Sequence, residues 1–309
     1  MKPARPLFVP CLTAALLCGS ALAVSTAAQE ARPTFRASVA LVPVTAAVRD
    51  SRHRIVRGLT RNDFDVREDS ERREIVDFVA SDGAPASVAV VVDTSGSMRG
   101  RNWERANTFA ERLVARMTLP DDEVALFTFD KNLCQQTPFT RDPASVRAAL
   151  RDVEPFGQTS LYDAIGEAAG RVAPRRGQQR AVIVITDGMD TSSTMSPAEV
   201  SALAGAVDVP VYAVAVAPGS ASSRPAGDHT AALAQLAFLT GGDVSYLPDT
   251  DDFDRAINTV VTELRQQYFL AFQSDAAPGF HRIDVRTRRR DLTVRARSGY
   301  FAGGAGTRH

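Results

Sequence analysis

The sequence predicts an α/β fold, in which a doubly wound, mostly parallel sheet is joined to a small β-sandwich-like domain formed by the two chain flanks. Two observations predict it. In the middle of the chain, short aliphatic runs alternate with stretches of helical length, which is typical of a parallel sheet covered on both faces. On either side of this middle, the residues follow the alternating pattern of strands and no helical period appears.

The middle region, residues 86–267, is expected to hold the parallel sheet and its helices. Apolar runs predict strands at residues 88–92, 124–129, 181–186, 211–216 and 244–247. Helices are expected between them, at residues 103–116, 143–153, 161–172, 197–207, 231–239 and 253–266.

The two flanks, residues 33–82 and 268–301, both have a strand pattern. Neither flank has enough strands to close a core alone, so we expect them to pair into one small β-sandwich with the middle region inserted between them. The expected strands are residues 35–48, 63–67, 74–79, 268–272, 282–286 and 292–297. Residues 302–309 are expected to form a frayed tail.

Residues 1–28 have the pattern of a secretory signal peptide. Basic residues open the chain, an apolar run covers residues 7–17, and small residues follow as far as Ala28. Cleavage after Ala23 and cleavage after Ala28 both fit this pattern. The mature protein is therefore expected to be exported to the periplasm, the cell surface or the medium, and to have no transmembrane segment.

Charge and cysteine content argue against a nucleic-acid-binding protein and against a protein stabilised by disulfides. The chain has 36 basic and 36 acidic residues, so no net field attracts nucleic acid, and we expect no nucleic-acid partner. Of the 3 cysteines only Cys134 would remain after removal of the signal peptide, so no intrachain disulfide is expected. We expect Cys134 to be a half-buried structural residue.

Oxygen-bearing side chains gather in three loops of the middle region. The first, residues 93–98, follows the strand expected at 88–92. The second, residues 157–163, precedes an expected helix, and the third, residues 186–190, follows the strand at 181–186. Ligands of open α/β sheets bind beyond the carboxyl ends of the strands, so these loops are candidates for a shared site.

Five residues of these loops resemble the metal-ion-dependent adhesion site of the von Willebrand factor A family. Asp93, Ser95 and Ser97 form a D-x-S-x-S motif, and Thr159 and Asp187 follow in the family's chain order. The resemblance implies a Mg²⁺ ion held by the hydroxyls of Ser95, Ser97 and Thr159. Asp93 and Asp187 would act mostly through water molecules, and a carboxylate from a protein partner would fill the remaining position.

The donor types agree with this assignment, because Mg²⁺ prefers octahedral oxygen coordination and retains several water molecules. Mn²⁺ and Ca²⁺ are the alternatives, since the choice depends on the size and rigidity of the cavity. A wider resemblance, to a bacterial family of exported VWFA-related proteins, covers nearly the whole mature chain. It rests on residues 58–64, 68–69, 186–193 and 295–301, and it implies the architecture more than a biological role.

The same residues have simpler structural explanations. Asp93 and Ser95 are types that cap a following helix, Thr159 or the adjacent serine could cap the next one, and Asp-Gly is a common turn pair. Asp163 is expected to orient the Thr159 loop by hydrogen bonding. Asp190 is expected to cap a helix or to brace its own loop, and neither is placed in the metal shell.

Enzymatic functions have little support in the sequence. A phosphotransferase with Asp93 as nucleophile would need a second aspartate where Ser95 stands. No G-x-S-x-G, H-E-x-x-H, paired-cysteine or P-loop pattern occurs. We therefore expect a non-enzymatic binding or adhesion module. The alternative is a scaffold or assembly protein in which the metal site is structural or vestigial.

Three consecutive arginines, residues 288–290, lie between two strands expected in the C-terminal flank. A solvated hairpin turn explains them best, and a contact with a polyanion is the alternative.

Overall fold

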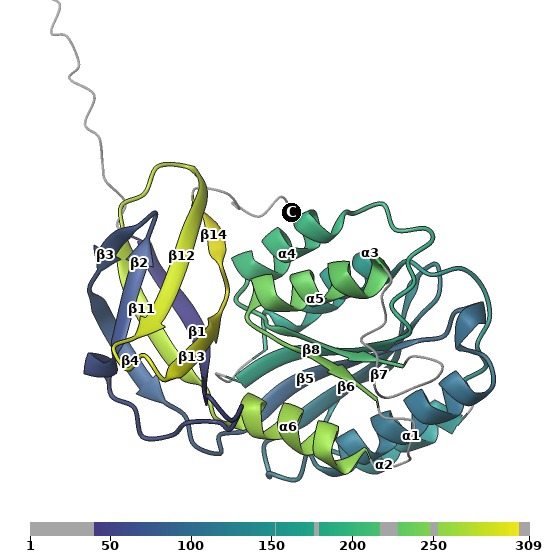
Figure 1. The fold of residues 1–309 in the computed structure, drawn as a ribbon. Helices are drawn as coiled ribbons and strands as arrows, with labels where there is room; N and C mark the ends of the chain where they lie inside the picture. The colour runs from purple at the N-terminus through teal and green to yellow at the C-terminus, as the bar shows by residue number, and fades with distance from the viewer. Residues whose placement is uncertain (1–39, 152, 176–178, 217–227, 248–252, 303–309) are drawn as a thin grey trace, which may run out of the picture. The chain divides into compact units, whose positions relative to one another are not determined.

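The computed structural model describes residues 40–151, 153–175, 179–216, 228–247 and 253–302, and these residues belong to one compact unit (Figure 1). The predicted signal peptide and most of the predicted tail lie outside the described residues. Within them, no helix is long and apolar enough to cross a membrane.

A six-stranded sheet forms the centre of the α/β region, in the strand order β10-β9-β8-β5-β6-β7. Neighbouring strands are parallel except for the antiparallel pair β6 and β7. Every residue of the central strand β5 is buried, which explains its unbroken apolar sequence. The six strands are β5 (Ala86–Asp93), β6 (Glu123–Phe129), β7 (Leu133–Thr140), β8 (Gln179–Thr186), β9 (Val211–Ala215) and β10 (Val244–Tyr246).

Helices cover both faces of this sheet, so the predicted doubly wound fold is confirmed (Figure 1). Val88, Val90 and Val92 of β5 pack with one set of helices, and Ala89 and Val91 pack with the other. The first set is α1 (Arg101–Ala115), α2 (Pro143–Arg151) and α6 (Asp254–Arg265). The second set is α3 (Leu161–Val172), α4 (Pro197–Ala206) and α5 (Asp228–Thr240).

The two flanks form two four-stranded antiparallel sheets, with strand orders β13-β1-β11-β4 and β14-β12-β2-β3. Each sheet combines strands from both flanks, as predicted, and the two sheets share one apolar core. The N-terminal flank contributes β1 (Ala40–Asp50), β2 (Phe64–Glu68), β3 (Glu71–Arg73) and β4 (Ile75–Ala80). The C-terminal flank contributes β11 (Tyr268–Ser274), β12 (Gly279–Thr287), β13 (Leu292–Ala296) and β14 (Gly299–Ala302).

Three strands, β3, β7 and β14, were not predicted because each is short or polar and lies at the edge of a sheet. The prediction for Cys134 is wrong. It lies on β7 and is exposed, because this edge strand has most of its side chains outside the core.

Buried charges connect β1 and β13 to helix α6. Glu263 of α6 is fully buried and forms an ion pair with Arg49 of β1. Arg295 of β13 lies 3.7 Å from the other carboxylate oxygen of Glu263. Asp243 is in the loop before β10. One of its carboxylate oxygens lies 3.2 Å from a guanidinium nitrogen of Arg49 and 2.5 Å from one of Arg295. We call these four residues the charged junction.

Candidate metal site

The three polar loops lie at one edge of the six-stranded sheet. Asp93 is the last residue of β5, and Asp187 directly follows β8. These two strands are parallel neighbours, with Val92 opposite Ile185, so their carboxyl ends meet at the same edge. Thr159 lies two residues before the start of α3, a helix that packs on β5 and β8.

Direct hydrogen bonds join the three loops to one another. The backbone N–H of Gly96 donates to the carbonyl of Gly157 over 3.0 Å. The hydroxyl of Thr186 donates to a carboxylate oxygen of Asp93 over 2.6 Å. The carbonyl of Thr159 accepts from the N–H groups of residues 191 and 192, at 2.9 and 3.0 Å. The five predicted residues are therefore held in one continuous cluster of loops.

Asp93 is a buried carboxylate with both oxygens engaged. Besides the bond from Thr186, it accepts a hydrogen bond of 2.9 Å from the backbone N–H of Ser95. Burial raises the pKa of Asp93 to about 6 against these hydrogen bonds, and the negative charge of Asp187 adds to the rise. Among the described residues, neither Asp93 nor Asp187 has an ion-pair partner. A cation placed here would stabilise both carboxylates.

The hydroxyl oxygens of Ser95 and Ser97 are 3.1 Å apart. Ser95 is buried and Ser97 is exposed, so the pair extends from the interior to the surface of the loop edge. Adjacent ligands of an octahedral Mg²⁺ ion, at about 2.1 Å from the metal, are separated by about 3.0 Å. The two hydroxyls are thus already spaced as neighbouring ligands of such an ion.

The helix-capping explanation does not account for these side chains. Gly100 is the N-cap of α1, so neither Asp93 nor Ser95 caps it. Ser95 does occupy the N-cap of the short 3-10 helix Gly96–Met98, but its side chain makes no capping hydrogen bond there. Ser160 is the N-cap of α3, again without a side-chain capping bond, and its hydroxyl lies 2.9 Å from that of Ser192.

The acidic residues left out of the metal shell brace the loops. Asp190 accepts a hydrogen bond of 2.8 Å from the N–H of Leu161. It therefore caps α3, which is one of the two roles expected for it. The prediction for Asp163 is wrong. Its carboxylate accepts from the N–H groups of Thr194 and Met195, at 2.9 and 2.8 Å, and not from the Thr159 loop. It therefore holds the segment that follows the third loop.

Sequence reasoning missed three residues that shape the site. Thr186 binds Asp93, Thr191 accepts from the N–H of Thr159 over 2.9 Å, and Asp130 lies beside Gly157. Gly157 has a φ of +101°, and a Cβ there would lie 3.1 Å from the Asp130 carboxylate. The dense hydroxyls of residues 186–194 were the available signal for the first two, whereas Asp130 follows a different strand and has no motif.

The described residues contain no group of three histidine, cysteine or acidic side chains that could hold a metal ion.

Residues 88–190 match the family described as von Willebrand factor type A domain. This segment, one third of the chain, is therefore similar to a von Willebrand factor type A domain. The match begins in β5 and ends at Asp190, so it includes all three loops of the candidate site. A search of curated protein sequences finds no match.

Solved structures also resemble this A-type domain. Proximal thread matrix protein 1 from the mussel byssus is 25% identical to this chain, with a TM-score of 0.50. The match covers 63% of this chain and 49% of that one. That structure has zinc in its metal-ion-dependent adhesion site (MIDAS) motif. An aerotolerance-related membrane protein from Bacteroides fragilis NCTC 9343 is 22% identical with a TM-score of 0.47, over 57% of this chain and 98% of that one. BatB from Bacteroides thetaiotaomicron is 22% identical with the same TM-score, over 58% and 98%.

Proposed function

We propose that the protein is an exported, non-enzymatic binding module that holds one divalent cation, which we take to be Mg²⁺. The ion would lie at the edge of the A-type domain where the three polar loops meet, which we call the loop edge. The ion would be bound by the hydroxyls of Ser95, Ser97 and Thr159. An acidic side chain of a protein partner would complete its coordination.

The observation that carries this proposal is the 3.1 Å spacing of the Ser95 and Ser97 hydroxyls beside two acidic groups that have no cationic partner among the described residues. Neutral hydroxyls bind the ion without cancelling its charge, so it remains attractive to a further carboxylate. The mussel protein that resembles this chain has a zinc-occupied MIDAS motif, which supports a divalent metal at the same edge.

The hydrogen bonds of Asp93 suggest how the carboxylates act. Both oxygens of Asp93 already accept from Thr186 and Ser95, so this residue is better suited to hold a metal-bound water than to bind the ion directly. Asp187 is half-buried and accepts a hydrogen bond of 3.1 Å from the N–H of Met189. Among the described residues its second oxygen accepts no hydrogen bond, so it can also hold a metal-bound water. Two carboxylates that act through water molecules would stabilise the ion without occupying the position left for a partner's carboxylate.

Calorimetric titration of Mg²⁺ into the chelator-treated protein, with and without acetate, tests this function. We expect one site per chain and tighter binding in acetate, because a carboxylate that ligates the bound ion must raise the affinity for the ion. Matched chloride is the control for ionic strength. Binding that is equally tight in chloride and acetate would contradict recognition of a carboxylate, and the absence of heat in both would contradict the metal site.

A further inference from the structure

A second candidate site lies in the β-sandwich, outside the three metal loops. It is a cavity of about 360 Å³ with a buried apolar floor formed by Phe64, Val66 and Ile75. These side chains come from β2 and β4, which belong to different sheets, so the cavity opens where the edges of the two sheets meet. Its size is at the lower end of the range for ligand pockets.

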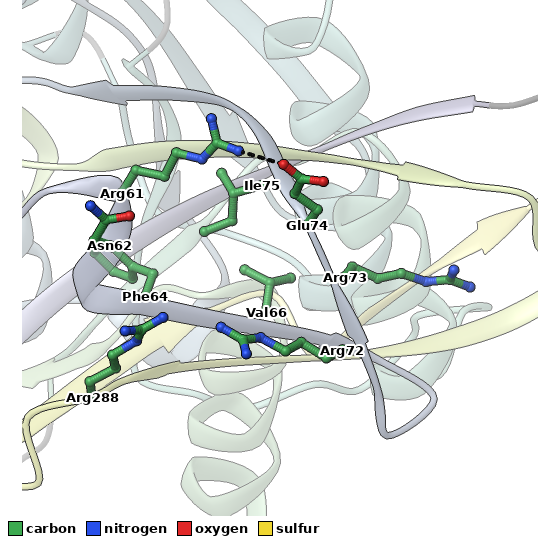
Figure 2. Close-up of a pocket in the computed structure, with 9 residues that line it drawn as sticks. All are labelled: Arg61, Asn62, Phe64, Val66, Arg72, Arg73, Glu74, Ile75 and Arg288. Carbon is green, nitrogen blue, oxygen red and sulfur yellow. Dashed lines mark hydrogen bonds and ion pairs between the residues drawn. The ribbon is translucent and has the colours of Figure 1, made fainter.

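Arginines surround this floor. Arg61, Arg72, Arg73 and Arg288 line the cavity with a single acidic residue, Glu74. Figure 2 shows Arg72 and Arg288 extending toward each other below Val66 and Phe64, with Arg61 on the other side and Arg73 directed away. We call Arg61, Arg72 and Arg288 the arginine pocket. Arg288 belongs to the Arg288–Arg290 run, which forms the predicted turn between β12 and β13.

The positive charge of the arginine pocket is only partly neutralised by the protein. Arg61 pairs with Glu74 at 3.1 Å, but the Glu74 side chain is 83% exposed, so this pair is weak and easily displaced. Arg72 uses its Nε for Asp65, at 2.9 Å, which leaves its terminal nitrogens free to donate. Among the described residues Arg288 has no ion pair. Guanidinium groups in this state favour carboxylate ligands, which they bind with paired hydrogen bonds.

The backbone next to the pocket can also bind a ligand. β3 and β4 are the terminal strands of their sheets, and among the described strands neither has a neighbour on its outer side. β4 also exposes Val76 and Val79. Exposed strand edges with unpaired N–H and C=O groups accept an extended peptide as an added strand. Phosphate, nucleic acid and sulfated sugars cannot use such an edge in this way.

We propose that the arginine pocket and the adjoining strand edges bind an extended acidic peptide segment of a protein partner. Carboxylates of the peptide would pair with Arg72, Arg288 and Arg61. The apolar side chains at the alternate positions would lie on the opposite face of the added strand. This site is independent of the metal ion and would give the protein a second contact surface.

Fluorescence anisotropy with a labelled, capped peptide of alternating Glu and Val residues tests the proposal, with the full chain in EDTA. The double variant Arg72→Gln, Arg288→Gln should bind about tenfold more weakly or worse, since it removes charge-assisted hydrogen bonds. The control is Arg289→Gln, Arg290→Gln, which removes the same total charge beside Arg288 and should bind like the wild type. Equal binding by both double variants would overturn the proposal.

Two further ligands separate a peptide site from a general anion site. The same peptide with N-methyl groups at alternate backbone positions keeps its charge but loses edge hydrogen bonds, so it should bind more weakly. A sulfated oligosaccharide of equal charge should compete poorly. Binding of either as tightly as the original peptide would show that a polyanion, not a peptide strand, is the ligand. Because EDTA removes divalent ions, failure here is distinguishable from failure of the metal site.

Discussion

The loop edge and the charged junction hold their buried charges in opposite ways. At the junction, Glu263 is buried between Arg49 and Arg295, which favour its charged form, although burial still raises its pKa. At the loop edge, Asp93 is just as buried, but in the described residues it has hydrogen-bond donors and no cationic partner. The first arrangement suits a structural connection. The second leaves negative charge that a bound cation would compensate.

The junction should show the largest effect on stability. Replacing Glu263 with Ala removes the buried carboxylate and leaves Arg49 and Arg295 with Asp243 alone, so we expect a loss of about 3 kcal/mol in the free energy of unfolding. Urea unfolding measures it. The control is Glu167→Ala, whose pair with Arg171 is exposed, and it should cost less than about 1 kcal/mol. Similar losses in the two variants would contradict the structural role of the junction.

The loop edge should instead lose metal affinity and keep its stability. Asp187→Ala should weaken Mg²⁺ binding at least about 100-fold, or about 2.7 kcal/mol. In chelator its unfolding midpoint should hardly change, because from the residues that the structure describes the Asp187 carboxylate accepts a single hydrogen bond. Asp190→Ala is the matched acidic control, since it removes the cap of α3 and should lower stability by about 1 kcal/mol while Mg²⁺ still binds. The reverse pattern would interchange the roles of these two aspartates.

A smaller effect should come from the backbone that places Thr159. Gly157→Ala forces a side chain onto a residue with φ of +101° and brings a Cβ against Asp130. We expect a loss of about 1–2 kcal/mol in stability and weaker metal binding, measured by unfolding and by titration. Gly170→Ala, in α3 with open space around it, should stabilise by about 0.5–1 kcal/mol. If Gly157→Ala is neutral, the loop does not depend on this conformation.

The smallest effect should be a pH dependence in the β-sandwich. The Nδ1 atom of His281 forms a hydrogen bond of 2.6 Å with a carboxylate oxygen of Asp69. This bond raises the pKa of His281 above 6.5 and lowers the pKa of Asp69 below 3.8. The stability that protonated His281 contributes is complete below the pKa that His281 has in the unfolded chain. It is lost as pH rises through the higher pKa of His281 in the folded protein. The carboxylate contribution is lost as pH falls through the folded pKa of Asp69.

Stability from this pair is therefore greatest between the two folded pKa values. Thermal unfolding of His281→Gln against the wild type should show a difference at mildly acidic pH that shrinks toward alkaline pH. A difference that is constant with pH would mean that the ion pair contributes nothing.

The parts of the fold that the sequence predicts are those specified by local patterns. The apolar run 88–92 and the D-x-S-x-S motif directly after it are adjacent in the chain, so they place a polar loop at the end of a buried strand. Thr159 and Asp187 are recognisable because each also lies at an end of a helix or strand with clear periodicity.

The rest depends on pairings between distant residues. Arg49 and Glu263 are 214 positions apart, and neither belongs to a motif. Strand β7 forms because β6 offers a free edge, although its own residues are mostly polar and partly or fully exposed. The partners of Asp163 are likewise decided by the path of the chain after the third loop. Such contacts follow from the assembled sheets, which local periodicity does not encode.

The most direct test of the central claim is an electron paramagnetic resonance titration of Mn²⁺ into the chelator-treated protein, with Ser97→Ala and Ser192→Ala alongside. Ser192 is the control because its hydroxyl lies against Ser160 and outside the proposed donor set. We expect one Mn²⁺ per chain to be bound by the wild type and by Ser192→Ala, and we expect Ser97→Ala to leave the ion free. Equal binding in all three proteins would contradict a cation held by the paired hydroxyls of Ser95 and Ser97.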